Sequence, residues 1–313
     1  MSLHTAHRPT SWGDVVGQDH IVKSLQKAAK DKRAHTFLFS GPSGVGKTTL
    51  ARILANEFAG GKASPANIYE IEAANYTGVD DMRRVLERAA MRAIGSSPVK
   101  SIILDEAHRL SGSAWDVLLK PTEEPPSHLY FMFCTTNLGK VPKAIVTRSL
   151  AFELKPVSED KLLELLVNVS DVQGLTVSDD IIEAIVEESA GSPRQSLVFL
   201  EACCGCATVA EAKKLMRSAA NSAEVIDLCR WLLQPRGGWN QAVTLVKKLN
   251  GAEPESARIN IVNYLAQVLL NTKGDDKAKH ILTVMEPFSE PFNTSDKMAP
   301  LLRAIALAIG MDQ

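Results

Sequence analysis

The sequence is poor in aromatic residues, which make up 5% of its 313 positions. This scarcity favours a helix-rich protein with aliphatic cores over an all-β one, because strands are enriched in aromatic side chains. A net charge of −1 gives no global sign of nucleic-acid binding, so any such surface must be local. No apolar run is long enough to span a membrane, and the opening MSLHTAHRPTSW lacks the apolar core of a signal peptide.

Cysteine is scarce as well, with five residues, and three of them fall in the stretch CCGC. The cysteines give no disulfide framework, so a reducing cytoplasmic compartment fits. Cys203, Cys204 and Cys206 lack paired spacing and a nearby histidine. We therefore expect small buried residues there and no zinc site.

The first half of the chain alternates short apolar runs with segments of helical periodicity. Five runs are expected to be strands buried on both faces: 36–40, 68–74, 100–107, 129–136 and 150–154. Strands that alternate with helices predict a parallel sheet covered by helices on both sides. After Pro156, apolar residues recur at i, i+3 and i+4, which predicts helices throughout. We expect three domains, at residues 1–156, 157–216 and 217–313.

The stretch GPSGVGKT (41–48) fits G-x-x-x-x-G-K-[ST] between a predicted strand and a predicted helix. Its glycines let successive backbone N–H groups turn toward one phosphate, and the helix N-terminus adds its dipole. Lys47 should reach the β- and γ-phosphates, and Thr48 should bind Mg²⁺. The alternative is a glycine turn with a surface lysine. The nucleotide site would comprise Gly41, Pro42, Ser43, Gly44, Val45, Gly46, Lys47, Thr48 and Thr49.

The stretch IILDEAH (102–108) supplies a second half of this site, because ligands bind at the carboxyl ends of strands in open α/β sheets. Asp105 would hold the hydration shell of Mg²⁺, and Glu106 would orient and deprotonate the attacking water. The alternative is an ordinary strand end with two solvated acids. Together the two motifs predict Mg²⁺-dependent hydrolysis of a nucleoside triphosphate.

Four further stretches resemble the clamp-loader ATPases of the AAA+ superfamily, in order and in spacing. They are HRPTSWGDVVGQDHIVKSL (7–25), LLKPTEEPPSH (118–128), TTN (135–137) and GSPRQSL (191–197). The likeness reaches to about residue 205 and is greatest to the gamma/tau branch and to the large phage subunits. It implies an α/β P-loop AAA+ ATPase domain over 1–156, a small helical lid over 157–216, and an all-helical collar over 217–313 that assembles the subunits.

The resemblance also implies roles for individual residues. Thr136 or Asn137 would be sensor 1, which bonds the γ-phosphate or the attacking water. Arg194 would be sensor 2 on the nucleotide phosphates, with Pro193 near the base; the alternative is a helix-start arginine on a solvated face. Pairing of Arg194 with phosphate would couple the lid angle to the nucleotide state. Four residues would line the adenine and ribose: Arg8, Pro9, Val16 and Gly17.

Arg148 lies between an apolar helical turn and an apolar strand, and nothing in the sequence indicates a partner for it within this chain. In clamp loaders this position carries Ser-Arg-Cys, and the arginine reaches the ATP site of the neighbouring subunit. A guanidinium supplied in trans stabilises the charge that develops on the γ-phosphate. Here the flanks are Thr147 and Ser149. The alternative is an ordinary surface arginine before a strand.

Two features depart from the family's pattern. The four-cysteine zinc module that gamma/tau subunits carry after the P-loop helix has no counterpart in 56–70, so no zinc is expected. The family's Leu-Leu-Lys-Thr-Leu-Glu-Glu helix reads Leu-Leu-Lys-Pro-Thr-Glu-Glu. Pro121 should therefore end or kink this helix early.

A clamp loader grips primer–template DNA without reading its sequence, so phosphate contacts suffice. The candidates are Arg83, Arg84 and Arg88, with Arg92 continuing the row of Arg84 and Arg88 at i, i+4 spacing. Arg83 matches the position at which family members touch the DNA backbone. The alternative is a solvated helix face that also carries acids.

The segment 108–119 corresponds to the helix that meets the clamp in the family. Leu110 and Trp115 are therefore candidate clamp contacts. The alternative for Trp115 is a place in the protein core.

The leading hypothesis is the ATPase subunit of a sliding-clamp loader, in which ATP binding opens a ring clamp for loading on primer–template DNA and hydrolysis releases it. Its partners would be the clamp, the DNA, other copies of the chain and at least one further loader subunit, with no membrane, in a bacterial or phage-infected cell. A short phage-type subunit fits. One alternative is a Holliday-junction branch-migration motor, which would need a C-terminal winged helix. Another is a non-catalytic loader subunit, against which Asp105, Glu106 and Arg148 argue.

Overall fold

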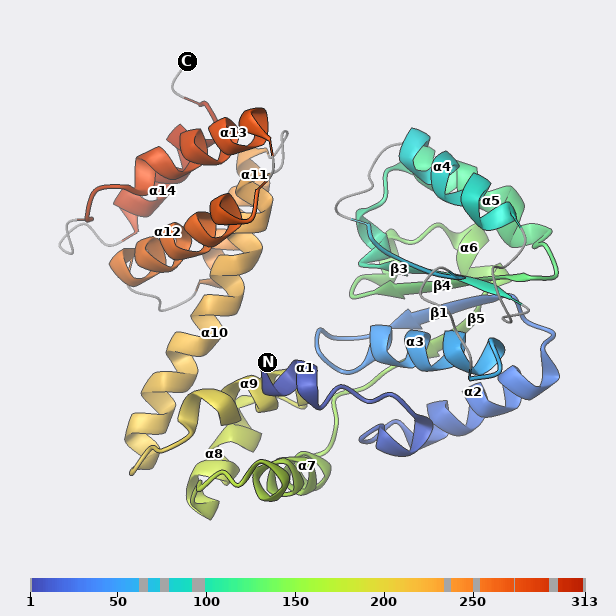
Figure 1. The fold of residues 1–313 in the computed structure, drawn as a ribbon, viewed down its shortest axis with the longest axis horizontal. Coiled ribbons are helices and arrows are strands. Elements are labelled where there is room, and N and C mark those ends of the chain that lie inside the picture. The colour runs from blue at the N-terminus through green and yellow to red at the C-terminus, as the bar shows by residue number, and fades with distance from the viewer. Residues whose placement is uncertain are drawn as a thin grey trace. The chain divides into compact units, whose positions relative to one another are not determined.

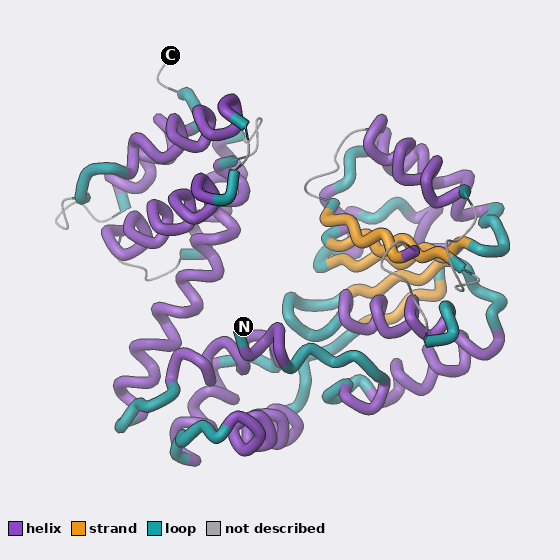
Figure 2. Tube along the Cα trace, viewed as in Figure 1, coloured by secondary structure: helices purple, strands orange, loops and turns teal. Residues whose placement is uncertain are grey.

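The computed structural model describes residues 2–61, 67–73, 79–91, 99–233, 238–249, 254–272, 274–292 and 298–311. The chain divides into two compact units, Met1–Cys204 and Gly205–Gln313. Figure 2 distinguishes the strands, which all lie in the first unit, from the helices of both units. The domain boundaries expected near residues 156 and 216 remain predictions. The second of them falls within a single helix, α10 (Val209–Leu232).

The first unit is built on a five-stranded sheet in which each neighbouring pair of strands is parallel, in the order β2-β3-β4-β1-β5 (Figure 1). All five predicted strands are present. Their bounds are β1 (Thr36–Ser40), β2 (Ile68–Glu72), β3 (Lys100–Asp105), β4 (Leu129–Thr135) and β5 (Leu150–Glu153).

Only the three inner strands are buried on both faces. The side chains of β1 and β4 are buried throughout, and those of β3 are buried except at Asp105. The expectation that all five strands are buried on both faces is wrong for β2 and β5. These two strands form the edges of the sheet, so each pairs on one side only and exposes part of its side chains.

Helices cover both faces of the sheet, as predicted. Along β1, Phe37 and Phe39 belong to one core cluster and Leu38 to the other, because successive side chains of a strand point to opposite faces. One face is covered by α2 (Asp19–Asp31) and α3 (Lys47–Phe58). The opposite face is covered by α4 (Val79–Ala90), α5 (Gly112–Glu123) and α6 (Lys143–Arg148) (Figure 1).

Three longer helices complete the first unit: α7 (Glu159–Gln173), α8 (Asp179–Glu188) and α9 (Pro193–Cys203). Acidic residues fill the first turns of α7 and α8, where they complement the helix dipole. The short helix α1 (Leu3–Ala6) packs against α9. The remaining short elements of this unit are η1 (Trp12–Asp14), η3 (Ala107–Arg109) and η4 (Leu138–Lys140).

The described part of the second unit is entirely helical, which agrees with the predicted helical character. Its core contains Leu228, Ile261, Leu265, Phe288 and Ile305, each fully buried. None of the described helices of the chain is long and apolar enough to cross a membrane. The elements are α10, α11 (Trp239–Lys248), α12 (Pro254–Leu270), α13 (Asp275–Met285), η5 (Glu286–Phe288) and α14 (Ala299–Ala308).

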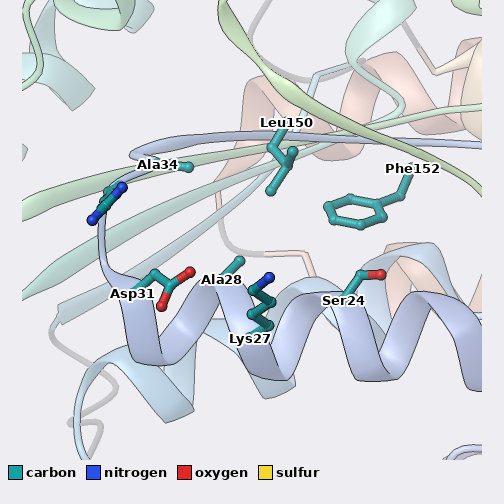
Figure 3. Close-up of a pocket in the computed structure, with 8 residues that line it drawn as sticks. Ser24, Lys27, Ala28, Asp31, Ala34, Leu150 and Phe152 are labelled. Atoms are coloured by element: carbon teal, nitrogen blue, oxygen red, sulfur yellow. The ribbon is translucent and has the colours of Figure 1, made fainter.

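A cavity of about 360 Å³ lies between α2 and the edge strand β5. Leu150 and Phe152 point from β5 toward Ser24 and Ala28 of α2 (Figure 3). The cavity contains none of the residues predicted to bind nucleotide.

The sequence predicts that Pro121 ends or kinks α5 early. It does not end the helix, and the kink stays a prediction. The helix continues to Glu123, although Pro121 has no N–H to donate to the carbonyl four residues earlier. The buried hydroxyl of Thr122 lies 2.8 Å from the Leu118 carbonyl and 2.9 Å from the Leu119 carbonyl, which supplies hydrogen bonds in the last turn. Glu123 is the final residue of the helix.

We predict that Thr122→Val lowers the free energy of unfolding by about 1 kcal/mol, because it removes this buried hydroxyl at nearly constant volume. Urea denaturation measures the change. Thr147→Val is the matched control: its hydroxyl also bonds the carbonyl four residues back, at 3.1 Å, but it is exposed. Equal effects of the two substitutions would contradict a stabilising role for the Thr122 hydroxyl.

Candidate nucleotide site

The loop 41–46 connects β1 to α3, and its glycines satisfy two separate constraints. Gly41, Gly44 and Gly46 have φ angles of 141°, 77° and 105°, which side chains with a Cβ rarely adopt. A Cβ at Gly41 would lie 2.3 Å from the Leu154 carbonyl oxygen, and one at Gly44 would lie 2.1 Å from Ser192 Oγ. The loop therefore packs closely against its surroundings as well as turning sharply.

Lys47 begins α3 and is 6% exposed, so it is not a surface lysine. Its Nζ donates to the carbonyl oxygens of Gly41 and Pro42 at 3.0 Å and 2.6 Å. Burial lowers the pKa of the Lys47 ammonium, and the nearby Glu106 carboxylate opposes that shift. The ammonium thus lies within the loop that would surround a phosphate.

Thr48 and Asp105 meet at the carboxyl edge of the sheet. The Thr48 hydroxyl donates to Asp105 Oδ2 at 2.9 Å, and the Glu106 N–H donates to Asp105 Oδ1 at 3.0 Å. One carboxylate and one hydroxyl oxygen beside a phosphate-binding loop form the oxygen donor set that suits Mg²⁺, which is commonly held by few protein oxygens together with phosphates. The residues present therefore fit this ion.

Glu106 lies directly beyond β3 with a φ angle of 50°, in the left-handed region. Its Oε2 accepts a hydrogen bond from the Thr136 hydroxyl at 3.0 Å. Burial raises the pKa of the Glu106 carboxyl, against the lowering effect of that hydrogen bond. Of the two sensor 1 candidates, Thr136 contacts Glu106 through its side chain. Asn137 contributes its backbone N–H, which donates to Thr135 Oγ1 at 3.0 Å.

The N-terminal segment joins the site through Arg8, whose Nε donates to Thr49 Oγ1 at 3.3 Å. Gly17 lies against Val157, since a Cβ there would be 3.3 Å from both of its methyl groups. Pro9 and Val16 are half-buried in the same segment.

Arg194 lies beside the P-loop. Its backbone N–H is 3.5 Å from the Gly44 carbonyl oxygen, and it follows Pro193 in the first turn of α9. Ser192 caps this helix, with its Oγ accepting from the Gln195 N–H at 3.2 Å. The Arg194 side chain is exposed, and no ion pair is found for it among the described residues.

Arg148 lies near the amino-terminal ends of the strands, whereas the P-loop lies at their carboxyl ends. Leu150, two residues later, is in register with Phe37 near the start of β1, whereas the P-loop follows Ser40 at the end of β1. Phe37 and Ser40 are three residues apart, so the distance between these two levels along β1 is about 10 Å at roughly 3.3 Å per residue. Arg148 pairs with Glu123 Oε2 at 2.9 Å, so the expectation that it has no partner within this chain is wrong.

The predicted DNA contacts lie on α4, away from the loop. Arg83 and Arg84 are 61% and 73% exposed, and each pairs with an acid three residues earlier, at 3.3 Å and 3.8 Å. Arg88 is exposed on the same helix. Arg92 lies outside the described residues.

Leu110 and Trp115 are buried, with exposed fractions of 7% and 3%. Both belong to the core between the sheet and α5, where the Trp115 ring lies 5.4 Å from that of Phe133. The structure favours the core alternative for Trp115, and neither side chain presents much surface to a partner.

Comparison with known families identifies the core of the first unit. Residues 37–156 match the ATPase family associated with various cellular activities (AAA). This part of the chain is an AAA ATPase domain. The predicted α/β P-loop AAA+ fold is thereby confirmed.

Full-length relatives match a larger share of the chain than residues 37–156. The tau subunit of DNA polymerase III from Bacillus subtilis is 35% identical over 219 residues, which cover 64% of this chain and 39% of the relative. The gamma subunit from Buchnera aphidicola subsp. Baizongia pistaciae is 34% identical over 214 residues, 62% of this chain and 57% of the relative. The chain thus spans about two fifths to three fifths of these relatives, and the predicted resemblance to gamma/tau subunits is confirmed.

Solved AAA+ structures share the architecture. The RuvB Holliday junction branch migration motor of Thermotoga maritima superposes with a TM-score of 0.57 over 77% of this chain and 85% of that protein. Sequence identity is 21%, so this likeness shows the fold alone.

Three contacts of the site were not predicted. Glu123 pairs with Arg148, the side chain of Gln18 bonds the Lys155 carbonyl at 2.6 Å, and His108 contacts Glu106. Of these three contacts, only the one between His108 and Glu106 had a signal in the sequence, because the two residues are two positions apart. The other two contacts join residues far apart in the chain.

We predict that Gly44→Ala destabilises the protein more than Gly60→Ala. Gly60 has a similar φ angle of 69°, but open space surrounds the position of its Cβ, so its replacement costs only the left-handed conformation, about 1 kcal/mol. Gly44→Ala adds the clash with Ser192 and should also weaken binding of a fluorescent ATP analogue. Urea denaturation and titration measure the two effects, and equal free-energy losses would contradict the close packing at Gly44.

Proposed function

We propose that this chain is the ATPase subunit of a sliding-clamp loader, which binds ATP to open and load a ring clamp on primer–template DNA and hydrolyses it to release the clamp. The observation that carries the proposal is that the predicted nucleotide-binding residues and the predicted arginine finger lie far apart on the same chain. Residues suited to ATP and Mg²⁺ gather at one edge of the sheet, and Arg148 lies at the other. The AAA domain and the relatedness to DNA polymerase III gamma and tau subunits support it.

In this proposal the chain's own groups bind and activate ATP. Lys47 exchanges the carbonyls of Gly41 and Pro42 for phosphate oxygens, and the loop N–H groups donate to the same phosphates. Thr48 and Asp105 would hold Mg²⁺, which would supply positive charge to offset the negative charge of the phosphates. The base and ribose contacts would come from Arg8, Pro9, Val16, Gly17 and Pro193.

Hydrolysis then needs a base, a sensor and cations on the phosphates. Glu106 takes a proton from the attacking water, and its raised pKa brings it closer to the range in which a base accepts protons efficiently. Thr136 or Asn137 bonds the γ-phosphate or the water. Arg194 binds the phosphates from α9, which would couple the orientation of 157–216 to the nucleotide state.

Arg148 would act on the ATP bound by another copy. Its position at the far edge of the sheet leaves it remote from its own P-loop, and its pairing with Glu123 is an exposed ion pair. Exposed pairs contribute little, about 0–1 kcal/mol, so the guanidinium is available for a phosphate. The proposed assembly contains other copies and at least one further loader subunit.

Duplex DNA would be held by its phosphates through Arg83, Arg84 and Arg88, whose side chains are exposed on α4. The sliding clamp is the remaining partner. Because Leu110 and Trp115 are buried, contact with the clamp would rest mainly on exposed neighbours in 108–119.

A branch-migration motor is the second candidate, since the fold is similar to that of RuvB. Two observations weigh against it. The identity to RuvB is 21%, against 34–35% to the gamma and tau subunits, and the described residues of the second unit contain no strand of the kind a winged helix requires. A non-catalytic subunit does not explain the clustering of Lys47, Asp105 and Glu106.

The proposal predicts that ATP hydrolysis rises at least about tenfold when primed DNA and the cognate clamp are both present, because they complete the assembly around each site. A phosphate-release assay on the assembled loader measures the rate. Unprimed double-stranded DNA without the clamp is the control. Hydrolysis that responds to neither ligand would exclude a clamp loader while leaving an ATPase.

A second prediction concerns Arg148. Arg148→Ala should leave ATP binding unchanged but lower stimulated hydrolysis about 10³-fold, the loss typical of a missing arginine finger. Lys143→Ala, which removes an exposed cation from the same helix, is the matched control and should retain activity.

Mixing tests whether the arginine acts in trans. Copies with Arg148→Ala keep Glu106, and copies with Glu106→Gln keep Arg148, so mixed assemblies should regain hydrolysis that neither variant shows alone. No recovery on mixing, with assembly verified by light scattering, would contradict a role in trans.

A further inference from the structure

His108 contacts the Glu106 carboxylate from the turn η3 that follows β3. Its Nδ1 lies 3.3 Å from Glu106 Oε2 and 3.2 Å from Thr135 Oγ1, and its side chain is only 15% exposed. The imidazole therefore lies between the end of β4 and the proposed base.

The contact with Glu106 is attractive in one tautomer of this imidazole. A carboxylate only accepts hydrogen bonds, so Nδ1, 3.3 Å from Oε2, is attracted to it when Nδ1 carries the hydrogen. In that tautomer Nδ1 donates its hydrogen bond to Thr135 Oγ1 at 3.2 Å, and the Glu106 carboxylate lies close to the same N–H. His108 thus joins Glu106 to the end of β4.

Two polar groups contact the same oxygen of the Glu106 side chain. The Thr136 hydroxyl donates to Oε2 at 3.0 Å, His108 Nδ1 lies 3.3 Å from it, and no hydrogen bond to Oε1 is found among the described residues. Two polar contacts on one oxygen limit rotation of the carboxylate, and they leave Oε1 as the oxygen able to accept a proton from water.

The two donors differ in what else they are expected to do. Thr136 is a sensor 1 candidate, and a hydroxyl engaged with the γ-phosphate cannot also donate to Oε2, because it has a single hydrogen. No contact with the phosphates is proposed for His108, so its contact with Glu106 is expected to persist when Thr136 turns to the γ-phosphate.

We infer that His108 is a positioning residue for Glu106, holding Oε2 so that Oε1 faces the attacking water throughout ATP hydrolysis. The inference rests on the proposed role of Glu106 as the base. The competing explanation is a buried histidine whose hydrogen bonds merely stabilise the fold.

Three substitutions separate these explanations. His108→Asn retains an N–H donor at the same distance along the side chain as Nδ1, His108→Gln moves the donor one atom further out, and His108→Ala removes it. Loss of the polar contact with the charged Glu106 is expected to lower kcat about tenfold or more in the Ala and Gln variants, while the Asn variant stays within about threefold of wild type. The affinity for ATP should be unchanged in all three.

Steady-state hydrolysis by the assembled loader, with primed DNA and the clamp present, gives kcat, titration with a fluorescent ATP analogue gives Kd, and the melting temperature reports on folding. His128→Ala is the matched control, because His128 is also half-buried and its Nε2 lies 3.3 Å from the Ala89 carbonyl oxygen. It should keep the wild-type kcat.

Glu106→Gln, measured in parallel, separates failure of this inference from failure of the proposed function. If Glu106→Gln abolishes hydrolysis but His108→Ala has the wild-type kcat, the inference is overturned and the ATPase stands. Equal losses in the Asn, Gln and Ala variants, with matching losses of melting temperature, would also overturn it in favour of a structural role. Absence of hydrolysis by the assembled wild-type loader, with primed DNA and the clamp present, would overturn both.

Discussion

The parallel pairing of β3, β4 and β1 is the constraint on which the candidate site depends. Each of these strands is buried, and parallel pairing places all three carboxyl ends at one edge. The P-loop, the two acids and the sensor candidates follow those ends directly. The Thr48–Asp105 hydrogen bond then joins the first turn of α3 to the end of β3. Residues more than fifty positions apart thereby become neighbours.

Partial burial gives this edge its chemical character. Lys47 and Glu106 are both partly withdrawn from water, which favours the neutral form of each. Burial therefore lowers the pKa of Lys47 and raises the pKa of Glu106, and the attraction between the two charges opposes both shifts. Such opposed shifts are typical of sites that bind a charged ligand and move a proton. The exposed pairs on α4 lack this feature, since solvent screens them.

The strands, the covering helices and the phosphate loop could be predicted because each depends on local sequence: continuous apolar runs, helical periodicity and fixed glycine spacing. Errors arose where position in the whole fold decides. The apolar residues of β2 and β5 predict burial on both faces, but each strand also contains glutamate, and the strand order places them at the edges of the sheet. Glu123 and Arg148 are twenty-five residues apart, and their pairing depends on where α5 ends. The orientation of His108 likewise follows from the turn after β3.

The opposite placement of the P-loop and Arg148 has a consequence for symmetry. If the arginine of one copy serves the phosphate of the next, the two contacting surfaces are different, and the contact is heterologous. A two-fold symmetric pair would bring like surfaces together and complete neither site. Copies would instead follow one another with a common direction, and in an arrangement that does not close, the nucleotide at one end would lack its arginine. Such an assembly would hydrolyse ATP unequally along its length, although its copies are chemically identical.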